Sequence, residues 1–202
     1  MNREPWRGPA DGRAYSYLLG LYLGDGSIGM PSRGCVQLTF TLDARYPGIV
    51  AEATRAVELT IPGIHVGNSR APGAIRVQAT HPAWLAAFPQ HGPGRKHTRP
   101  IALVDWQRRL TLEHPRELIR GLIHSDGCRV INRFRTRLPS GRVGEYAYVR
   151  YFFTNYSADI AGIFCDHCDQ LGIRWTRSSF KNISIAHRDS VAILDSFVGP
   201  KE

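Results

Sequence analysis

Two apolar segments of the chain end alike, and this internal repeat constrains the fold more than any other feature. The first reads Leu-Leu-Gly-Leu-Tyr-Leu-Gly-Asp-Gly over residues 18–26, and the second reads Ile-Arg-Gly-Leu-Ile-His-Ser-Asp-Gly over residues 119–127. Their aspartates, Asp25 and Asp126, are 101 positions apart in a chain of 202 residues. Self-similarity at a fixed spacing indicates copies of one folding unit. The sequence therefore predicts a duplicated domain.

The residues after each segment also repeat in order. A hairpin-like pair of strands closes on Phe-Thr, a helix follows by apolar spacing, a strand opens after glycine, a second strand alternates, and a helix led by histidine ends in a Gly-Lys tail. We therefore expect an α+β fold in which each half runs αββαββα. The matched features are Phe40-Thr41 and Phe153-Thr154, helices over 46–59 and 158–171, strands after Gly63 and Gly172, and final helices led by His81 and His187.

The repeat predicts a division of the chain into two halves joined by a helix. The expected parts are an N-terminal extension over 1–12, a first half over 13–100, a linker helix over 101–114 and a second half over 115–202.

The charge points to a polyanionic partner. The chain has 26 Lys and Arg against 17 Asp and Glu, a net charge of +9. The two halves carry +5 and +4, so both are expected to meet the anion, and nucleic acid is favoured over membrane. Of the basic residues 23 are Arg and 3 are Lys. Arginine binds phosphate and guanine bidentately, but a GC-rich genome also enriches it, so both explanations stay open.

Cysteine use and hydropathy indicate a cytoplasmic protein, and the basic charge adds association with the nucleoid through nucleic acid. Four scattered cysteines do not make a secreted disulfide framework, and the chain has no apolar signal segment or membrane span. The pair Cys165-Asp-His-Cys168 resembles half of a zinc site, but no second pair has suitable spacing. We favour a structural role for Cys168, on the apolar stripe of a helix.

Small residues lie four apart in each apolar segment, which allows two helices to pack closely. They are Gly20 and Gly24 in the first segment, and Gly121 and Ser125 in the second. The apolar stretches are too short to cross a membrane, so packing within a soluble protein remains.

Each predicted helix ends in Asp-Gly, where glycine is a favoured helix stop and the carboxylate lies at the negative end of the helix dipole. If the helices pack together, Asp25 and Asp126 converge. Two carboxylates beside free carbonyl oxygens form a hard-oxygen site suited to Mg²⁺. The aspartate pair is the catalytic hypothesis.

The two segments resemble the LAGLIDADG motif of homing endonucleases, in the arrangement with two motifs on one chain, and the resemblance covers residues 13–201. It implies a compact monomer with the motif helices at its centre and two antiparallel sheets forming a saddle on double-stranded DNA. It further implies Mg²⁺-dependent cutting of both strands across the minor groove, with 3′ overhangs, and Ca²⁺ as a non-catalytic substitute. The metal ligands implied are Asp25 and Asp126, with carbonyls from Gly24 and Ser125.

The chain departs from the motif at three places. Leu23 and His124 stand where the family name has its earlier acid, a position that varies in the family. Arg120 replaces a small or apolar residue, and we expect it to face solvent or to pair with Glu117.

Family members often place a basic residue near the centre, where it would stabilise the charged transition state. Lys96 and Lys201 stand at matched positions of the repeat, and Lys96 is preferred, with Lys201 and Lys181 as weaker candidates. Asp43 and Asn155 follow the two Phe-Thr pairs and are expected to order water, although Asp43 can instead cap the next helix.

Alternate strand residues and scattered arginines are the candidates for DNA contact, with Arg suited to guanine and Gln or Asn to adenine. Three arginines of the second hairpin follow a period of two and share a strand face, for which a solvated surface is the alternative reading. The predicted contacts are Arg33, Gln37, Thr39, Arg70, Arg76, Gln78, Arg129, Arg133, Arg135, Arg137, Arg150, Arg174, Arg177, Lys181 and Asn182.

Two other functions remain open beside the site-specific endonuclease. One is a DNA-binding transcriptional regulator on the same fold without catalysis, and the other is an RNA maturase for intron splicing. The chain lacks the Cys or Ser start and the His-Asn end of an intein, so we expect a free-standing or intron-encoded protein, with intron homing as its context.

Overall fold

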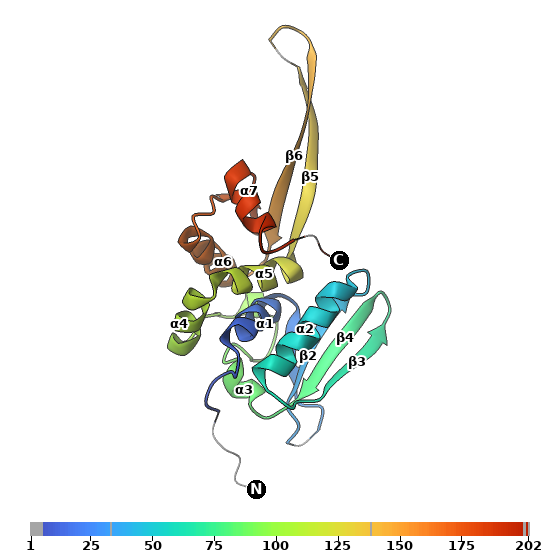
Figure 1. Cartoon of the computed structure of the whole chain (residues 1–202), viewed down its shortest axis with the longest axis vertical. Coiled ribbons are helices and arrows are strands. Elements are labelled where there is room, and N and C mark those ends of the chain that lie inside the picture. Colours follow the sequence, from blue (N-terminus) through green and yellow to red (C-terminus); the bar gives the residue numbers. More distant parts are fainter. Residues whose placement is uncertain (1–5, 33, 138, 200, 202) are drawn as a thin grey trace.

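A computed structural model describes residues 6–32, 34–137, 139–199 and 201, and it contains two halves with the same order of elements (Figure 1). The first half comprises α1 (Gly12–Asp25), β1 (Gly26–Gly29), β2 (Gln37–Asp43), α2 (Pro47–Thr60), β3 (Val66–Ala71), β4 (Ala74–Thr80) and α3 (Trp84–Ala87), followed by a 3₁₀ turn over Lys96–Thr98. The second half comprises α5 (Pro115–Asp126), β5 (Gly127–Arg137), β6 (Val143–Thr154), α6 (Ala158–Gln170), β7 (Thr176–Arg177), β8 (Asn182–Ile185) and α7 (Arg188–Asp195). Helix α4 (Asp105–Glu113) joins them.

Each half forms a four-stranded antiparallel sheet, and both sheets have the same strand order. The orders are β1-β2-β4-β3 and β5-β6-β8-β7. The glycine after each motif aspartate opens a strand and faces the matched phenylalanine, Gly26 opposite Phe40 and Gly127 opposite Phe153. The predicted αββαββα duplication and α+β class are confirmed.

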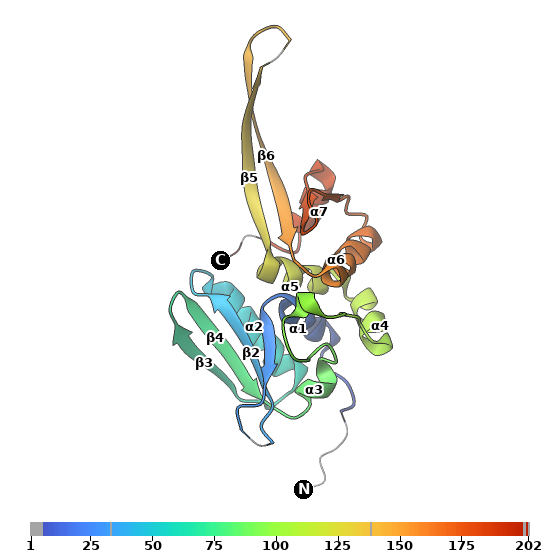
Figure 2. The same ribbon diagram turned by 180° about the vertical axis from the view of Figure 1, so that it is seen from behind.

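Helix α1 lies at the centre of the molecule and is buried on nearly every side. Asp11 begins the helix by accepting a hydrogen bond of 2.9 Å from the backbone N–H of Ala14. Every residue from Tyr15 to Leu23 is buried, because α1 packs against both α5 and α2. Viewed from behind, α1 and α5 lie side by side between the two sheets (Figure 2). The two halves therefore share one hydrophobic core.

Both motif helices end at the aspartate and are followed by glycine, as predicted, but neither glycine is left-handed. Gly26 has φ −82° and Gly127 has φ −109°, which is extended backbone and not the left-handed turn expected of a glycine stop. Packing explains these glycines instead. A Cβ atom on Gly26 would lie 2.6 Å from Cα of Tyr22, and one on Gly127 would lie 2.7 Å from Cα of Ile123.

The strands predicted after Gly63 and Gly172 begin later than expected, at Val66 and Thr176. Each of these glycines has a positive φ, 79° and 67°, so each forms a turn that precedes the strand.

The hairpin of β5 and β6 is the main difference between the halves. Pairing between these strands continues from Gly127 opposite Phe153 to Arg137 opposite Val143, whereas β8 pairs with β6 only over 151–154. The rest of the hairpin is a two-stranded ribbon that projects beyond the body of the molecule (Figure 1). The corresponding β1–β2 pairing covers four residue pairs.

The Cys165-Asp-His-Cys168 segment lies on α6, and both thiols are free and buried. Burial raises the pKa of Cys165 to about 11, so its thiol stays protonated and is a poor metal ligand. The preferred structural role of Cys168 is confirmed by its place in the core. Within the described part of the chain, no helix is long and apolar enough to span a membrane.

Candidate active site

The two motif helices approach each other through glycine. A Cβ atom on Gly20 would lie 2.4 Å from the carbonyl oxygen of Leu118, and one on Gly121 would lie 2.2 Å from that of Tyr17. Backbone therefore meets backbone at this crossing, and the small-residue spacing has the role that we predicted.

The same packing brings the ends of the helices together. A Cβ atom on Gly24 would lie 2.5 Å from Cβ of Ser125 and 2.9 Å from Oδ2 of Asp126. Asp25 and Asp126 are both partly buried, and their carboxylates interact electrostatically. The predicted convergence of the two acids is present.

The surroundings of the aspartate pair disfavour its negative charge. Burial, followed by repulsion from Asp126, raises the pKa of Asp25 to about 6, and Lys201 and Lys96 partly oppose this shift. Burial also raises the pKa of Asp126, against a hydrogen bond from Asn155 that lowers it. A site that makes its carboxylates hard to ionise gains most from a bound cation.

Lys96 lies against the end of α1. Its Nζ donates to the carbonyl oxygens of Tyr22, Gly24 (3.0 Å) and Gly26 (2.6 Å), and it also lies 4.9 Å from the centroid of the Tyr22 ring. An ammonium group has three protons, so these carbonyls engage all of them. Burial lowers the pKa of Lys96 to about 8, although both aspartates favour its charged form.

Lys201 has the matching place in the second half. Its Nζ donates a hydrogen bond of 2.9 Å to the carbonyl oxygen of His124, near the end of α5. Each lysine thus binds the motif helix of its own half, and both lysines favour the charged forms of the two aspartates.

An open pocket of roughly 370 Å³ lies on the Asp126 side of the centre. Gly24, Lys96 and Asp126 line it together with Asn155 and Tyr156. Its walls come from both halves of the chain, so a ligand in the pocket would contact both.

The residues present fit a hard divalent cation that takes part of its oxygen shell from outside the protein. Within 6–32, 34–137, 139–199 and 201, no three His, Cys, Asp or Glu side chains gather around a common point. Two carboxylates supply only part of an oxygen shell, which water or phosphate oxygens must complete. The carbonyl of Gly24 accepts from Lys96, and the hydroxyl of Ser125 donates to the carbonyls of Gly121 and Leu122.

The expectation that Asp43 and Asn155 occupy matched positions of the two halves is wrong. Phe40 and Phe153 occupy matched positions, so the counterpart of Asn155 is the buried Leu42 and not Asp43. Asn155 donates a hydrogen bond of 2.6 Å to Asp126. Asp43 forms an ion pair of 2.6 Å with Arg45, which lowers the pKa of its carboxyl to about 2.

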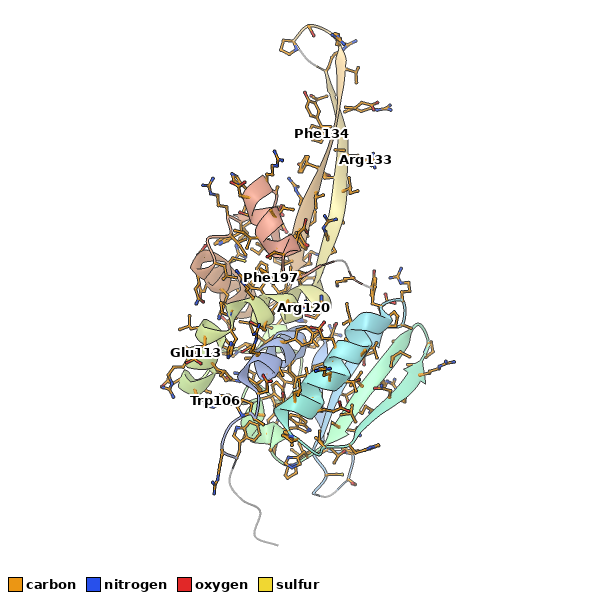
Figure 3. All side chains as sticks on the ribbon, in the orientation of Figure 1. Trp106, Glu113, Arg120, Arg133, Phe134 and Phe197 are labelled. Carbon is orange, nitrogen blue, oxygen red and sulfur yellow. The ribbon has the colours of Figure 1, made fainter. Side chains whose placement is uncertain are left out.

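The expectation for Arg120 is also wrong. Its guanidinium donates to Glu52 of α2 at 2.9 Å and to the carbonyl oxygen of Phe197 at 2.6 Å, while Glu117 pairs with Arg13. Figure 3 shows Arg120 and Phe197 close together.

Glu52 also approaches the buried His124, whose Nδ1 lies 3.7 Å from a Glu52 oxygen and 3.0 Å from the hydroxyl of Tyr17. This polar cluster was not predicted from the sequence. Its signal there was Arg120, a charged residue at an apolar motif position.

The outward faces of the two sheets carry part of the predicted DNA contacts. On the first sheet the Gln78 amide donates to Gln37 at 3.2 Å and to Thr39 at 3.5 Å. On the second sheet the Arg150 guanidinium lies 5.2 Å from the Tyr148 ring centroid and 5.4 Å from that of Phe152. The predicted contacts on outward strand faces are Gln37, Thr39, Arg76, Gln78, Arg150 and Asn182.

The predicted contacts of the second sheet lie on both of its faces. Arg133 lies on the same side of the ladder as Tyr151, which faces the helices, whereas Asn182 lies opposite Thr154 on the outward side. Other predicted contacts lie on the strand faces that continue the helix-covered faces of the sheets. These helix-side residues are Arg70, Arg129, Arg133, Arg135, Arg137 and Arg177.

Some of these helix-side arginines have partners in the protein. Arg129 is bound to Asp195 of α7 at 2.8 Å, and Arg135 to Glu145 at 2.7 Å. Arg133 lies on the projecting hairpin, where both faces are open (Figure 3). DNA contact by these arginines stays a prediction.

Two further predicted contacts, Arg174 and Lys181, lie off the sheet faces. Arg174 approaches Nε2 of His187 at 3.1 Å, and Lys181 donates to the hydroxyl of Tyr156 at 2.9 Å. Arg33 lies outside the described residues.

Comparison by sequence finds no matching family model and no matching curated protein. Comparison by structure finds the homing endonuclease I-DmoI in complex with DNA and Mn, with a TM-score of 0.60 and 13% identity over 93% of this chain and 97% of that one. The LAGLIDADG meganuclease I-AabMI bound to uncleaved DNA matches with a TM-score of 0.54 and 10% identity over 91% and 82%.

The N-terminal LAGLIDADG domain of DUF199/WhiA matches as well, with a TM-score of 0.53 and 11% identity over 96% of this chain and 87% of that one. These likenesses extend over both halves and both sheets. The chain has the fold of the LAGLIDADG homing endonucleases.

Proposed function

We propose that this protein is a site-specific double-strand DNA endonuclease that uses Mg²⁺ held by Asp25 and Asp126 and leaves 3′ overhangs. One observation carries the proposal: two carboxylates meet at the ends of the central helices, with Lys96 bound to carbonyls at the end of α1 and Lys201 to a carbonyl near the end of α5. An ion pair that only stabilises the fold needs no such duplication. A centre that must bind a phosphate on each of two strands needs these groups twice.

The two aspartates would hold the ion through their oxygens, and a bound cation would favour the ionised forms that burial disfavours. Bound there, Mg²⁺ would act as a Lewis acid toward the phosphoryl oxygens. Asn155 fixes the orientation of the Asp126 carboxylate. Lys96 and Lys201 place positive charge where negative charge develops during cleavage.

The outward sheet faces would lie along the duplex. Gln37 and Gln78 offer amide groups of the kind that pair with adenine, and Arg150 offers the fork that pairs with guanine. The I-DmoI and I-AabMI structures that this chain resembles hold DNA, which supports a double-stranded partner.

A regulator that binds DNA without cutting it is the second candidate. A likeness in fold at 10–13% identity does not choose between the two functions. The carboxylate pair favours the nuclease, because two acids that repel each other destabilise a protein that binds no cation there. An RNA maturase would use the same basic surface on structured RNA.

A cleavage selection over a random duplex library tests the proposal, with Mg²⁺ in one arm and Ca²⁺ as the binding-only arm. We expect one family of sequences to be cut in Mg²⁺ and bound uncut in Ca²⁺. Asp25→Asn and Asp126→Asn should abolish cutting and retain binding. The matched control is Asp105→Asn, which changes an exposed carboxylate of α4.

Each other outcome points to a different function. Enrichment of bound but never cut sequences would support the regulator, and preference for structured RNA would support the maturase. Loss of binding in Asp25→Asn would contradict the division between metal and DNA residues.

A further inference from the structure

Two aromatic rings of the second half lie in solvent at the edge of the candidate active site. The Phe180 side chain is 72% exposed and that of Tyr156 is 58% exposed, the highest values among the aromatic residues that the structure describes. Phe180 belongs to the connection between β7 and β8, and Tyr156 follows β6. Large aromatic rings in water raise the free energy of the unbound protein. Contiguous exposed apolar surface of this kind marks interaction sites.

The rings form a cluster that draws on both halves. The Tyr156 and Phe180 centroids are 5.9 Å apart with their planes at 61°, and the His97 ring of the first half lies 5.8 Å from Tyr156. Lys181 binds the Tyr156 hydroxyl and lies 4.6 Å from its ring centroid. Because the contact between the two rings is edge-on, much of Phe180 stays open for another flat group.

The cluster is continuous with the aspartate centre. Tyr156 and His97 line the same pocket as Lys96 and Asp126. The residue before Tyr156 is Asn155, which binds Asp126 directly. When a phosphate of a DNA strand enters this pocket, a base next to that phosphate must pass over the rings of Tyr156 and Phe180.

The first half has a different arrangement. Its β3–β4 connection is Pro72-Gly73 and not an aromatic turn. Its ring near the centre is that of Tyr46, which is half-buried against the core and has Lys201 5.9 Å and Arg45 5.6 Å from its centroid. The exposed pair of rings therefore lies on the Asp126 side of the centre.

We propose that Tyr156 and Phe180 form a stacking site for one unstacked base of the DNA strand on the Asp126 side. The ligand class is a nucleobase within a polyanionic strand, since Lys96, Lys181 and Arg95 surround the rings with positive charge. Aromatic side chains stack on bases or wedge between base steps in many DNA-binding proteins. The inference rests on the proposed DNA-binding function, because the rings meet a base only if a duplex lies on the saddle.

Binding to duplexes that differ in a single unpaired base tests the site without knowledge of the target. The full chain in Ca²⁺ is titrated with a fully paired duplex of mixed sequence and with the same duplex carrying one bulged 2-aminopurine. An unpaired base needs least energy to leave the stack. Wild type should bind the bulged duplex at least about fivefold more tightly, given base–aromatic stacking of roughly 1–3 kcal/mol, and should quench the 2-aminopurine fluorescence.

The double variant Tyr156→Ala/Phe180→Ala should lose this preference and the quenching, so that it binds the two duplexes with equal affinity. The matched control is Phe134→Ala/Tyr146→Ala, which removes two stacked exposed rings, 5.2 Å apart, from the hairpin. It should keep the preference. Both double variants change exposed side chains, and thermal unfolding checks that each is folded.

Three outcomes would overturn the stacking site: equal binding of both duplexes by wild type, a preference retained by Tyr156→Ala/Phe180→Ala, or a preference lost in both double variants. Failure of the wild-type protein to bind either duplex would instead reject the proposed DNA-binding function, and the stacking site with it.

Discussion

Nδ2 of Asn155 lies 2.6 Å from Oδ2 of Asp126 and donates a hydrogen bond to it, whereas the buried Leu42 has the matching place in the first half. Asn155→Leu makes the second half resemble the first. A hydrogen bond to a charged carboxylate favours its ionised form, so the loss of this bond should raise the pKa of Asp126 further. The pH at which Mg²⁺-dependent cleavage begins should rise accordingly.

The measurement is cleavage rate against pH on the selected target. Asn68→Leu, an amide of β3 whose nearest side-chain partner is Thr54 at 3.5 Å, is the control and should leave the profile in place. An unchanged onset in Asn155→Leu would show that the hydrogen bond does not tune the carboxylate.

Gly20→Ala should destabilise the protein strongly. The added methyl group would lie 2.4 Å from a backbone oxygen of α5, which cannot move without separating the two motif helices. Overpacking of this kind costs roughly 1–3 kcal/mol or more, against a gain of up to about 1 kcal/mol in helix propensity. Gly162→Ala on α6 is the control, since its methyl group would meet no atom within 4 Å and should be neutral or stabilising. Denaturant unfolding of both variants decides the matter.

Asp25→Asn should stabilise the metal-free protein at neutral pH. The pKa of Asp25 is raised to about 6 from an ordinary 3.8, so the folded state resists its ionisation. Stability of the wild type is therefore lost as pH rises from about 4 to about 6, and the full cost is present above that range. The variant should be more stable by roughly 1–3 kcal/mol at pH 7 and equal to wild type near pH 3.5.

Unfolding with a chelator present, across this pH range, gives the comparison. Addition of Ca²⁺ at pH 7 should then stabilise wild type and leave Asp25→Asn unchanged. A variant that is no more stable than wild type at pH 7 would remove the argument that a cation is needed at the aspartate pair.

Lys96→Arg should change how cleavage depends on alkaline pH. Burial lowers the pKa of Lys96 to about 8, so its positive charge is lost as pH rises through that value. Cleavage by wild type should fall above about pH 8, and arginine, which stays charged beyond about pH 12, should abolish this fall even if the maximal rate is lower. Lys181→Arg should keep it. The same fall in all three proteins would exclude Lys96 as its source.

Shortening the long hairpin should contract the DNA footprint on one side only. Removal of residues 133–147 takes away Arg133, Arg135, Arg137 and Arg142, and leaves the pairing of β6 with β8 over 151–154 intact. The slope of log K against the logarithm of the salt concentration should become less negative, by up to roughly 0.9 for each phosphate that the shortened protein no longer neutralises. Hydroxyl-radical footprinting on the selected target tests the asymmetry. A footprint that shrinks on neither side would mean that the hairpin points away from the duplex.

The sequence predicted the helices, the duplication and the aspartate pair because each rests on local or repeated spacing. Period two showed that Arg133, Arg135 and Arg137 share a strand face, but not which one. Residues 148–153 read Tyr-Val-Arg-Tyr-Phe-Phe, with apolar side chains on both faces, so register against β8 was needed to place Tyr151 inward.

Contacts between distant elements could not be predicted in the same way. The partner of Arg120 is Glu52, 68 positions away on a helix of the other half, and only the packing of α2 against the motif helices brings the two together. The approach of both lysines to the aspartate pair likewise depends on how the halves dock. Residue type marked Lys96 as a candidate, but the three carbonyls that it binds are a property of the folded chain.

The close crossing of Gly20 and Gly121 makes the core of this protein inseparable from its chemistry. The contact that buries α1 also sets the separation of Asp25 and Asp126, so a substitution that repacks the crossing must move the acids too. Evolution of this chain toward new targets is therefore expected to proceed through the sheet faces and the hairpin, which can vary without disturbing the centre.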